Sequence, residues 1–431
     1  MSQPYTNIRQ EKTVGKWGYC YVDVYKKSLE FHKQLHGKIE VTSRAKVNNE
    51  VELSLAYSPG VAEPCRHIAV NDELVYEYTG KGNMIAVVSD GSAVLGLGNI
   101  GPHAALPVME GKAVLFKDFA GVNAVPICLS SQDTDVIVEV VKHLGPSFAG
   151  INLEDISAPR CFEIEERLQQ ETDMLIFHDD QHGTAVVTLA GLINASRVVG
   201  RDLGNMRILV NGVGAAGSSI IRLLHLYGVR QITACGRDGA LYPGKEGMNK
   251  VQQGIAEMTN PQGRRGDLAK LIVDQDVFIG VSVANVMTEA MVRSMGPDPI
   301  VFALANPEPE IPVDRAKSAG AKVVASGRSD YPNQVNNVLG FPGIFRGALD
   351  VRARSINDSM KIAAAEAIAN LIDEDELRPD YVIPKPFDKR VVPEVATAVG
   401  LAAIKTGVAR VHLTEDELRS RAAQLTEQCL T

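Results

Sequence analysis

The chain has few cysteines, and no two of them stand close together. It contains six among 431 residues, at Cys20, Cys65, Cys128, Cys161, Cys235 and Cys429, without a C-x-x-C pair. This spacing offers no disulfide framework, and scattered cysteines of this kind are typical of buried or idle reduced thiols in an intracellular protein. We therefore assign the cysteines no role.

Long apolar runs and an excess of basic residues are also missing. No stretch approaches the roughly 20 apolar residues that span a bilayer, and the N-terminus lacks the basic start and apolar core of a signal peptide. Lys and Arg number 44 against 52 Asp and Glu, which gives a formal net charge of -8 and a pI near 5.7. These features argue against a membrane or nucleic acid as partner, and we expect a cytoplasmic protein.

The most informative segment is a complete glycine-rich turn. The apolar run 207–211 leads into Gly212-Val-Gly214-Ala215-Ala216-Gly217, and an amphipathic stretch continues to residue 227. A G-x-G-x-x-G turn between a strand and a helix binds the pyrophosphate of a dinucleotide on backbone N–H groups at the helix N-terminus. We therefore predict that this segment, Ala215 and Ala216 included, binds a nicotinamide or flavin dinucleotide.

Short apolar runs alternate with helical patterns along most of the chain, whose length of 431 residues suits two or three globular domains. This alternation predicts an α/β protein in which a Rossmann-like, doubly wound parallel sheet follows a first α/β domain, and residues 346–431 are mostly helical. The strands are expected at 84–88, 124–129, 148–153 and 174–177, then, after a long helix at about 184–199, at 207–211, 231–235, 277–282, 300–304 and 321–325.

Acidic residues follow two of the predicted strands. Glu154 and Asp155 end one apolar run, and Asp179 and Asp180 end another. Ligands of open α/β sheets bind beyond the carboxyl ends of the strands, so these acids can form an oxygen-rich pocket for Mg²⁺ or Mn²⁺. The alternatives are helix N-caps or loop charges, and a zinc site built on the His178 and His182 pair, whose spacing would serve only on a helix.

A lysine near such a metal site can act as a base if burial and the cation lower its pKa, and a tyrosine hydroxyl can donate a proton. Lys112 and Lys117 have equal claims to the first role from chemistry alone, and Tyr57 is a candidate for the second. Taken one by one, each is more often a surface lysine or a core tyrosine.

These segments together resemble the malic enzyme family. The match rests on motifs that occur in the family's order, namely A-Y-S-P-G-V-A-E-P-C at 56–65, S-D-G-S-A-V-L-G-L-G-N-I-G at 89–101, M-E-G-K-A-V-L-F-K at 109–117, N-L-E-D-I-S-A-P-R at 152–160, F-H-D-D-Q-H-G-T at 177–184, A-N-P at 305–307 and Y-P-N-Q-V-N-N at 331–337. The resemblance implies oxidative decarboxylation of L-malate to pyruvate and CO₂ with NAD or NADP and a divalent metal. It also implies a substrate and metal domain at 1–185, an NAD(P)-binding domain at 186–345 and a helical segment at 346–431.

The resemblance also assigns roles to individual residues. It places the metal on Glu154, Asp155 and Asp180, the general base on Lys112 and the general acid on Tyr57. It further implies that Asp179 pairs with Lys112, that Asn306 and Asn337 contact the substrate, and that Asn306 also faces the cofactor. One departure is Ala93, which stands where longer family members carry an arginine for a substrate carboxylate. Similarity to relatives also implies at least a homodimer.

Cofactor choice depends on the end of the second Rossmann strand, where an acid normally binds the ribose of NAD. Family members often have Asp where this chain has Gly236, and Arg237 can pair with the 2′-phosphate of NADP. We therefore favour NADP over NAD, the alternative being that Asp238 contacts the ribose. Two other functions stay open, namely malolactic-type or oxaloacetate decarboxylase chemistry without release of reduced cofactor, and a non-catalytic dinucleotide sensor.

Overall fold

The computed structural model describes residues 24–429, except for the side chains of Leu95 and of residues 427–429. The chain divides into two compact units, Met1–Lys46 and Val47–Thr431. The described part of the first unit contains helix α1 (Val24–Leu35), none of whose residues is buried. Cys20 lies outside the described residues, and Cys65, Cys128, Cys161 and Cys235 are free thiols.

The second unit begins with short helices and a four-stranded parallel sheet of order β2-β1-β3-β4. All four predicted strands are present, and β1, β3 and β4 are almost wholly buried, as expected where helices cover both faces of a parallel sheet. The elements are α2 (Glu50–Ala56), α3 (Ala62–Val70), α4 (Val75–Tyr78), β1 (Met84–Ser89), α5 (Pro102–Ala120), β2 (Asn123–Cys128), α6 (Thr134–Lys142), β3 (Gly150–Leu153), α7 (Arg160–Glu171) and β4 (Leu175–His178).

A second sheet has six strands in the order β10-β9-β8-β5-β6-β7. Its strands run parallel except for β7, which forms an antiparallel hairpin with β6 and was not predicted from the sequence. Chain order reverses between β5 and β8, which creates the switch point where doubly wound sheets bind dinucleotides. The elements are β5 (Ile208–Asn211), α9 (Ala215–Tyr227), β6 (Ile232–Gly236), β7 (Gly239–Ala240), α10 (Lys250–Met258), α11 (Leu268–Leu271), β8 (Val277–Gly280), α12 (Glu289–Arg293), β9 (Ile300–Ala303), α13 (Val313–Ser318) and β10 (Val323–Ser326).

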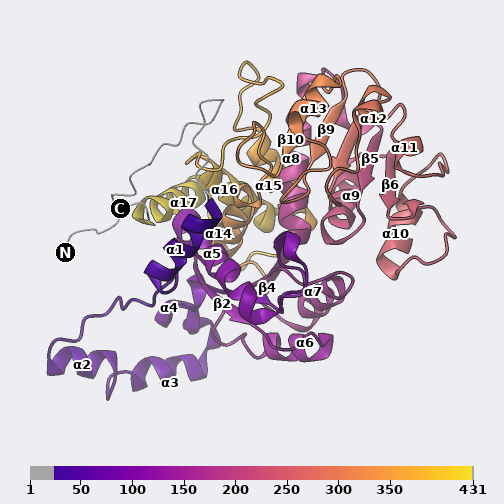
Figure 1. The fold of residues 1–431 in the computed structure, drawn as a ribbon. Helices are drawn as coiled ribbons and strands as arrows, with labels where there is room; N and C mark the ends of the chain where they lie inside the picture. Colours follow the sequence, from indigo (N-terminus) through magenta and orange to yellow (C-terminus); the bar gives the residue numbers. More distant parts are fainter. Residues whose placement is uncertain (1–23, 430–431) are drawn as a thin grey trace. The chain divides into compact units, whose positions relative to one another are not determined.

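Helix α8 (Thr184–Val198) joins the two sheets and packs against α9 and α15 (Asp358–Ala369) (Figure 1). It is apolar around most of its circumference, and it is buried from Ala185 to Ser196, as expected of a helix enclosed by other elements. The largest cluster of buried apolar side chains includes residues of both sheets and of the C-terminal helices. Both sheets therefore share one continuous core.

The C-terminal region is helical, as predicted. It comprises α14 (Phe341–Asp350), α15, α16 (Val391–Lys405) and α17 (Glu415–Cys429). The structure also shows the two hydrogen bonds of a capping box before α17, because the Thr414 backbone N–H donates to Glu417 and the Glu417 N–H donates to Thr414 Oγ1. Within residues 24–429, no helix is long and apolar enough to cross a membrane.

Candidate active site

The acidic residues meet at the carboxyl ends of β3 and β4. Leu153 is paired with His178 in the register of these strands, so Glu154 and Asp179 follow at neighbouring positions on the same edge of the sheet. The chain then forms a π-helical turn over Asp179–Gly183 that leads directly into α8. The sequence predicted the helix from Thr184 onward and missed this preceding turn, which carries Asp180.

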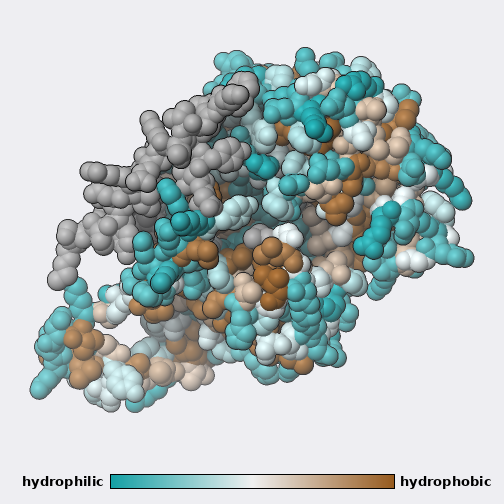
Figure 2. Space-filling model, viewed as in Figure 1, coloured by the Kyte–Doolittle hydropathy of each residue, from teal (hydrophilic) through white to brown (hydrophobic). Residues whose placement is uncertain are grey.

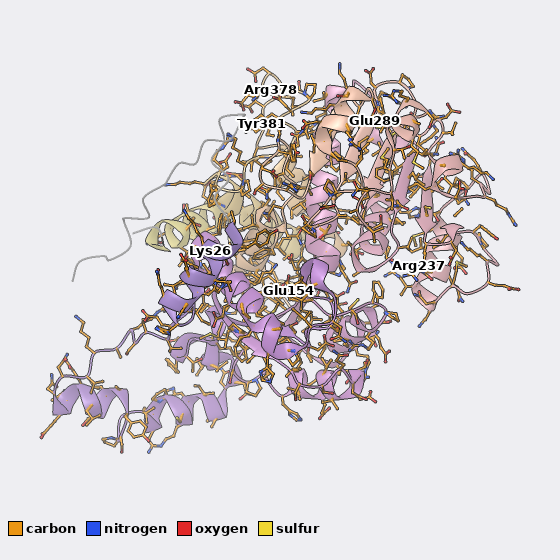
Figure 3. All side chains as sticks on the ribbon, viewed as in Figure 1. Lys26, Glu154, Arg237, Glu289, Arg378 and Tyr381 are labelled. Atoms are coloured by element: carbon orange, nitrogen blue, oxygen red, sulfur yellow. The ribbon has the colours of Figure 1, made fainter. Side chains whose placement is uncertain are left out.

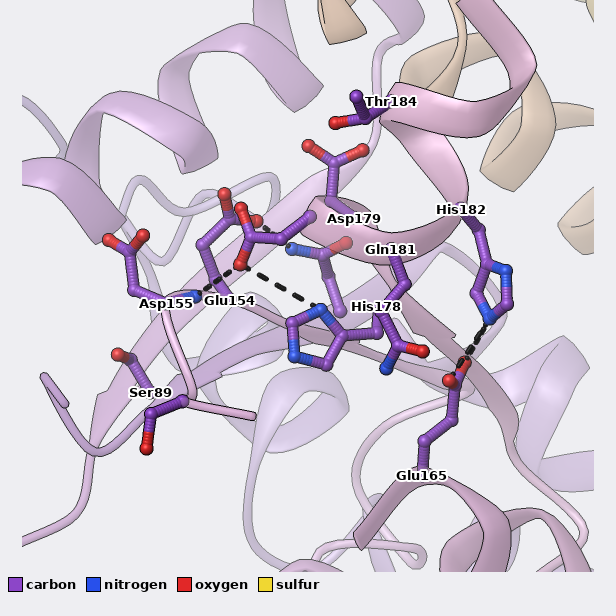
Figure 4. A network of polar contacts seen from close by, with 12 residues as sticks. Ser89, Glu154, Asp155, Glu165, His178, Asp179, Gln181, His182 and Thr184 are labelled. Carbon is purple, nitrogen blue, oxygen red and sulfur yellow. Dashed lines mark hydrogen bonds and ion pairs between the residues drawn. The ribbon is translucent and has the colours of Figure 1, made fainter. Parts of the chain in front are cut away.

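Glu154, Asp155 and Asp180 form a compact cluster of carboxylates, and Figure 4 labels the first two of them. Each offers an oxygen, and these oxygens lie within 4.8 Å of one another. The Asp155 backbone N–H donates to Asp180 Oδ2 at 2.8 Å, which ties the two strand ends together. Burial raises the pKa of Glu154 well above its ordinary value; Lys112 opposes this rise, whereas Asp180 and the other nearby acids add to it. An oxygen-only donor set of this kind fits Mg²⁺ or Mn²⁺.

Lys112, on α5, reaches the same cluster. Its Nζ lies 2.6 Å from Asp179 Oδ2 and 2.9 Å from Glu154 Oε1, and it stands 4.3 Å from the centre of the Phe341 ring. Burial opposes the charge, but the carboxylates of Asp179 and Glu154 outweigh burial and raise the pKa of Lys112. Lys117, on the same helix, is exposed and donates instead to Asn123. The geometry thus brings Lys112, rather than Lys117, to the acids.

Asn337 lies beside Asp179. Its Nδ2 donates to Asp179 Oδ2 at 3.0 Å and to Thr184 Oγ1 at 3.2 Å. Asn306 instead lies on an exposed loop after β9. There its carbonyl oxygen would be 2.8 Å from a Cβ at Gly96, so the glycine-rich loop after β1 approaches this loop of the second sheet closely. The structure therefore brings Asn337 into contact with Asp179, the residue that pairs with Lys112. It does not bring Asn306 there.

The predicted dinucleotide turn has the expected shape between β5 and α9. Gly212 has a φ of 107°, and a Cβ there would lie 2.4 Å from the Val281 oxygen; one at Gly217 would lie 1.8 Å from the Gly212 oxygen. Gly214 instead faces open space, and no side chain caps α9, which begins at Ala215. This exposed helix N-terminus is the feature that binds a pyrophosphate. Arg237 and Asp238 are exposed at the end of β6, whereas Glu154 lies at the first sheet (Figure 3).

Tyr57 lies outside this cluster. It ends α2, and its side chain is 70% exposed. Neither α2 nor α3 buries a residue, and both lie away from β4 (Figure 1). Within a single chain, the structure therefore does not bring Tyr57 to Lys112.

The two histidines each contact a carboxylate, but neither belongs to the cluster of Glu154, Asp155 and Asp180. His182 binds Glu165 of α7, with its Nε2 2.8 Å from Glu165 Oε1. His178 is buried at the end of β4, and its Nδ1 lies 3.8 Å from Asp180 Oδ2. Among the described residues, the group with metal-binding geometry contains carboxylates only, so the structure gives no support to the zinc alternative.

Sequence reasoning missed several residues that hold the site in shape. Arg160 Nη1 lies 2.8 Å from the buried Asp90, and its Nη2 donates to Ser92 Oγ, which joins the loops after β1 and β3. The Ala93 backbone N–H donates to the backbone carbonyl oxygen of Asp155. In the second sheet, buried Glu310 accepts N–H bonds from Ser282 and Ala305, after β8 and β9. Asp90 follows a strand, so the rule that singled out Glu154 could have found it.

Comparison with known proteins gives consistent matches. The malic enzyme N-terminal domain family matches residues 36–135 and 130–169, and the malic enzyme NAD-binding domain family matches residues 181–408. The bifunctional malic/malolactic enzyme of Bacillus subtilis (strain 168) is 61% identical over 400 residues, or 93% of this chain and 98% of that protein. The NAD-dependent malic enzyme of Geobacillus stearothermophilus is 53% identical over 393 residues, or 91% and 82% of the two chains. The crystal structure of malic enzyme from Pyrococcus horikoshii Ot3 matches with a TM-score of 0.91 and 47% identity, over 94% and 96% of the two chains.

A dinucleotide turn in the second, doubly wound sheet and a lysine among clustered carboxylates at the first sheet together define a dinucleotide-dependent enzyme. The chain belongs to the malic enzyme family, because the two family domains span most of its length. The α/β fold, the family resemblance and the prediction of an NAD(P)-dependent oxidoreductase are confirmed.

Proposed function

We propose that the protein oxidises and decarboxylates L-malate to pyruvate and CO₂, reducing NAD(P) with the help of a divalent cation. The observation that supports this most strongly is the contact of Lys112 with Glu154, one of three clustered carboxylates. It places a proton acceptor next to a set of cation ligands, and a hydroxy acid needs both. Glu154, Asp155 and Asp180 would hold Mg²⁺ or Mn²⁺, which supplies Lewis-acid polarisation of the substrate's C2 oxygen.

The chain's own residues then have separate tasks. Lys112 accepts the C2 hydroxyl proton while hydride passes to the nicotinamide, and Asp179 holds its Nζ in place. This role requires the neutral amine of Lys112, whereas Glu154 and Asp179 stabilise its charged form. A divalent cation held by Glu154 would weaken one of these two contacts and so favour the neutral amine. Asn306 and Asn337 orient the substrate, and Tyr57 supplies the proton that C3 receives after CO₂ has left.

The assay for this function follows pyruvate and reduced cofactor in the presence of L-malate, with NAD or NADP, and with or without Mn²⁺. We expect both products in equal amounts, and only when Mn²⁺ is present. Turnover that persists after removal of divalent cations would contradict the proposal.

A second candidate function is malolactic chemistry, in which lactate is formed and the cofactor is not released reduced. It is favoured by the relative from Bacillus subtilis, whose name includes a malolactic activity. Lactate formed from malate without net reduction of the cofactor would identify it, and the same assay detects oxaloacetate decarboxylation when oxaloacetate replaces malate.

The preferred cofactor is proposed to be NADP. Gly236 places no carboxylate where it would repel a 2′-phosphate, and the exposed Arg237 is available to pair with one. Relatives named as NAD-dependent and as NADP-dependent malic enzymes both occur among the matches.

Replacement of Arg237 tests this preference. In Arg237→Ala we expect kcat/KM for NADP to fall by about tenfold, since a charge-assisted hydrogen bond is lost, whereas kcat/KM for NAD stays nearly unchanged. Asp238→Ala is the matched variant. A loss of NAD use in Asp238→Ala, with no effect of Arg237→Ala on NADP, would show that Asp238 reads the ribose instead.

A further inference from the structure

Glu310 joins the ends of two central strands of the second sheet, β8 and β9. Backbone N–H groups still follow the strand pattern at Val281, which donates to β5, and at Leu304, which donates to β8. The next N–H group in each segment turns to Glu310 instead, from Ser282 to Oε1 at 2.7 Å and from Ala305 to Oε2 at 3.1 Å. A single carboxylate thus holds the loops after β8 and β9 at a fixed separation.

The carboxylate of Glu310 is enclosed by protein. Glu310 is 0% exposed, and a Cβ at Gly280 would lie 2.4 Å from its Cδ, so the strand leaves room for the acid because glycine stands there. By contrast, hydrophilic residues predominate on the surface over α12 and α13, the helices that precede and follow β9 (Figure 2). Burial raises the pKa of Glu310, and the N–H groups of Ser282 and Ala305 oppose that rise. These hydrogen bonds maintain the acid in the interior, and its two oxygens set where the donors lie.

One of the two loops lies against the dinucleotide turn. A Cβ at Gly212 would lie 2.4 Å from the Val281 oxygen, and one at Gly217 would lie 3.1 Å from Val281 Cγ2. Ser282 Oγ also accepts a hydrogen bond at 2.8 Å from Asn211 Nδ2, at the end of the strand that leads into the turn. The segment that Glu310 holds after β8 is therefore in contact with the part of the chain that we expect to bind the cofactor.

The other loop carries Asn306, which follows Ala305 directly and is proposed to orient the substrate. The Asn306 carbonyl oxygen would lie 2.8 Å from a Cβ at Gly96, in the glycine-rich loop that follows β1 of the first sheet. The loop after β9 therefore reaches the sheet whose strand ends carry the acid cluster. Glu310 thereby connects a segment beside the dinucleotide turn with the residue proposed to orient malate.

We propose that Glu310 is a positioning residue for hydride transfer, because its bonds to Ser282 and Ala305 set the distance between the nicotinamide and C2 of malate. A misplacement of about 1 Å between reacting groups can cost on the order of 100-fold in rate, and two bonds to one buried group can hold two loops that closely. The inference rests on the proposed function. In that reaction the C2 hydride, with its electron pair, reduces the nicotinamide, Lys112 takes the hydroxyl proton, and C2 becomes a ketone.

Glu310→Gln tests this role, because an amide offers one acceptor oxygen where two N–H groups need two. The rate constant for cofactor reduction is measured in a single turnover with saturating enzyme, L-malate and Mn²⁺, using the cofactor that wild type reduces faster. It refers to folded molecules alone, so partial unfolding leaves it unchanged. We expect it to fall about 100-fold, and L-malate deuterated at C2 to slow the variant further, since hydride transfer then limits the rate.

Asp276→Asn is the matched control. Asp276 is also buried and also joins two strands of this sheet, since it accepts a hydrogen bond at 2.8 Å from the Arg207 N–H, just before β5. It directly precedes β8, however, so it lies at the edge opposite to the dinucleotide turn. We expect Asp276→Asn to lower the melting temperature and to keep the rate constant within about twofold of wild type.

Glu310→Asp is the second variant, because it keeps the charge and both oxygens on a side chain one methylene shorter. We expect its rate constant to lie about tenfold below that of wild type, and this variant decides alone if Glu310→Gln does not fold. A wild-type rate constant in the Glu310 variants, an equal loss in Asp276→Asn, or no isotope effect in Glu310→Gln would each overturn the inference and leave the proposed function standing. Failure of the wild-type enzyme to reduce either cofactor with malate would overturn the proposed function itself.

Discussion

Malate turnover in Lys112→Ala is expected to fall by about 1,000-fold, in the middle of the range that a general base contributes. The ammonium of Lys112 is held within 3 Å of Asp179 and Glu154, and its side chain is only 10% exposed. No other lysine is brought to these acids in the described part of the chain, so no neighbour can take over the proton. Dinucleotide binding should survive, because the glycine turn belongs to the other sheet.

Lys117→Ala is the matched control for this variant. Lys117 lies on the same helix and loses the same charge, but its Nζ donates to Asn123 rather than to an acid of the site. We expect its kcat to remain within about twofold of wild type, as is usual for surface substitutions. The measurements are kcat with malate and the dissociation constant of the cofactor by calorimetry. Equal losses in the two variants, or loss of cofactor binding in Lys112→Ala, would show that α5 matters for folding rather than for proton transfer.

Much of this site follows from local sequence rules. Apolar runs located β3 and β4, and the acids that follow them had to converge because parallel strands end at one edge of a sheet. The glycine pattern gave the turn at Gly212 for a similar reason, since its close backbone contacts tolerate no side chain.

What the sequence did not reveal depends on contacts between distant segments. Lys112 and Lys117 have equal chemistry, and only the packing of α5 on the sheet brings Lys112 to Asp179. Arg160 and Asp90 lie on different loops, and no local sequence pattern indicates that they form an ion pair. Strand β7 is two residues long and pairs only with β6, so its signal is too short to detect. The location of Tyr57 could not be read from its motif either, since the motif specifies the turn but not its surroundings.

Removal of one carboxylate should have opposite effects on metal binding and on metal-free stability. In Asp155→Asn we expect Mn²⁺ to bind about 100-fold more weakly and malate turnover to fall in parallel, since an anionic ligand is lost. Without metal, the same variant should be more stable than wild type by about 1 kcal/mol, because like charges near Glu154 and Asp180 repel less. Asn suits the position because it tolerates the φ of 55° found at Asp155.

Thermal unfolding with and without Mn²⁺ separates this role from a structural one. At a Mn²⁺ concentration about 100 times its dissociation constant, wild type gains about 2.7 kcal/mol, whereas a variant with 100-fold weaker binding gains only about 0.4 kcal/mol. Asp173→Asn removes an exposed acid just before β4 and should leave both quantities unchanged. If Asp155→Asn instead lowered the metal-free melting temperature and kept the Mn²⁺-induced gain, the carboxylate would serve the fold. The metal would then have to bind other oxygens, because removal of a ligand carboxylate reduces the stability that the protein gains from Mn²⁺.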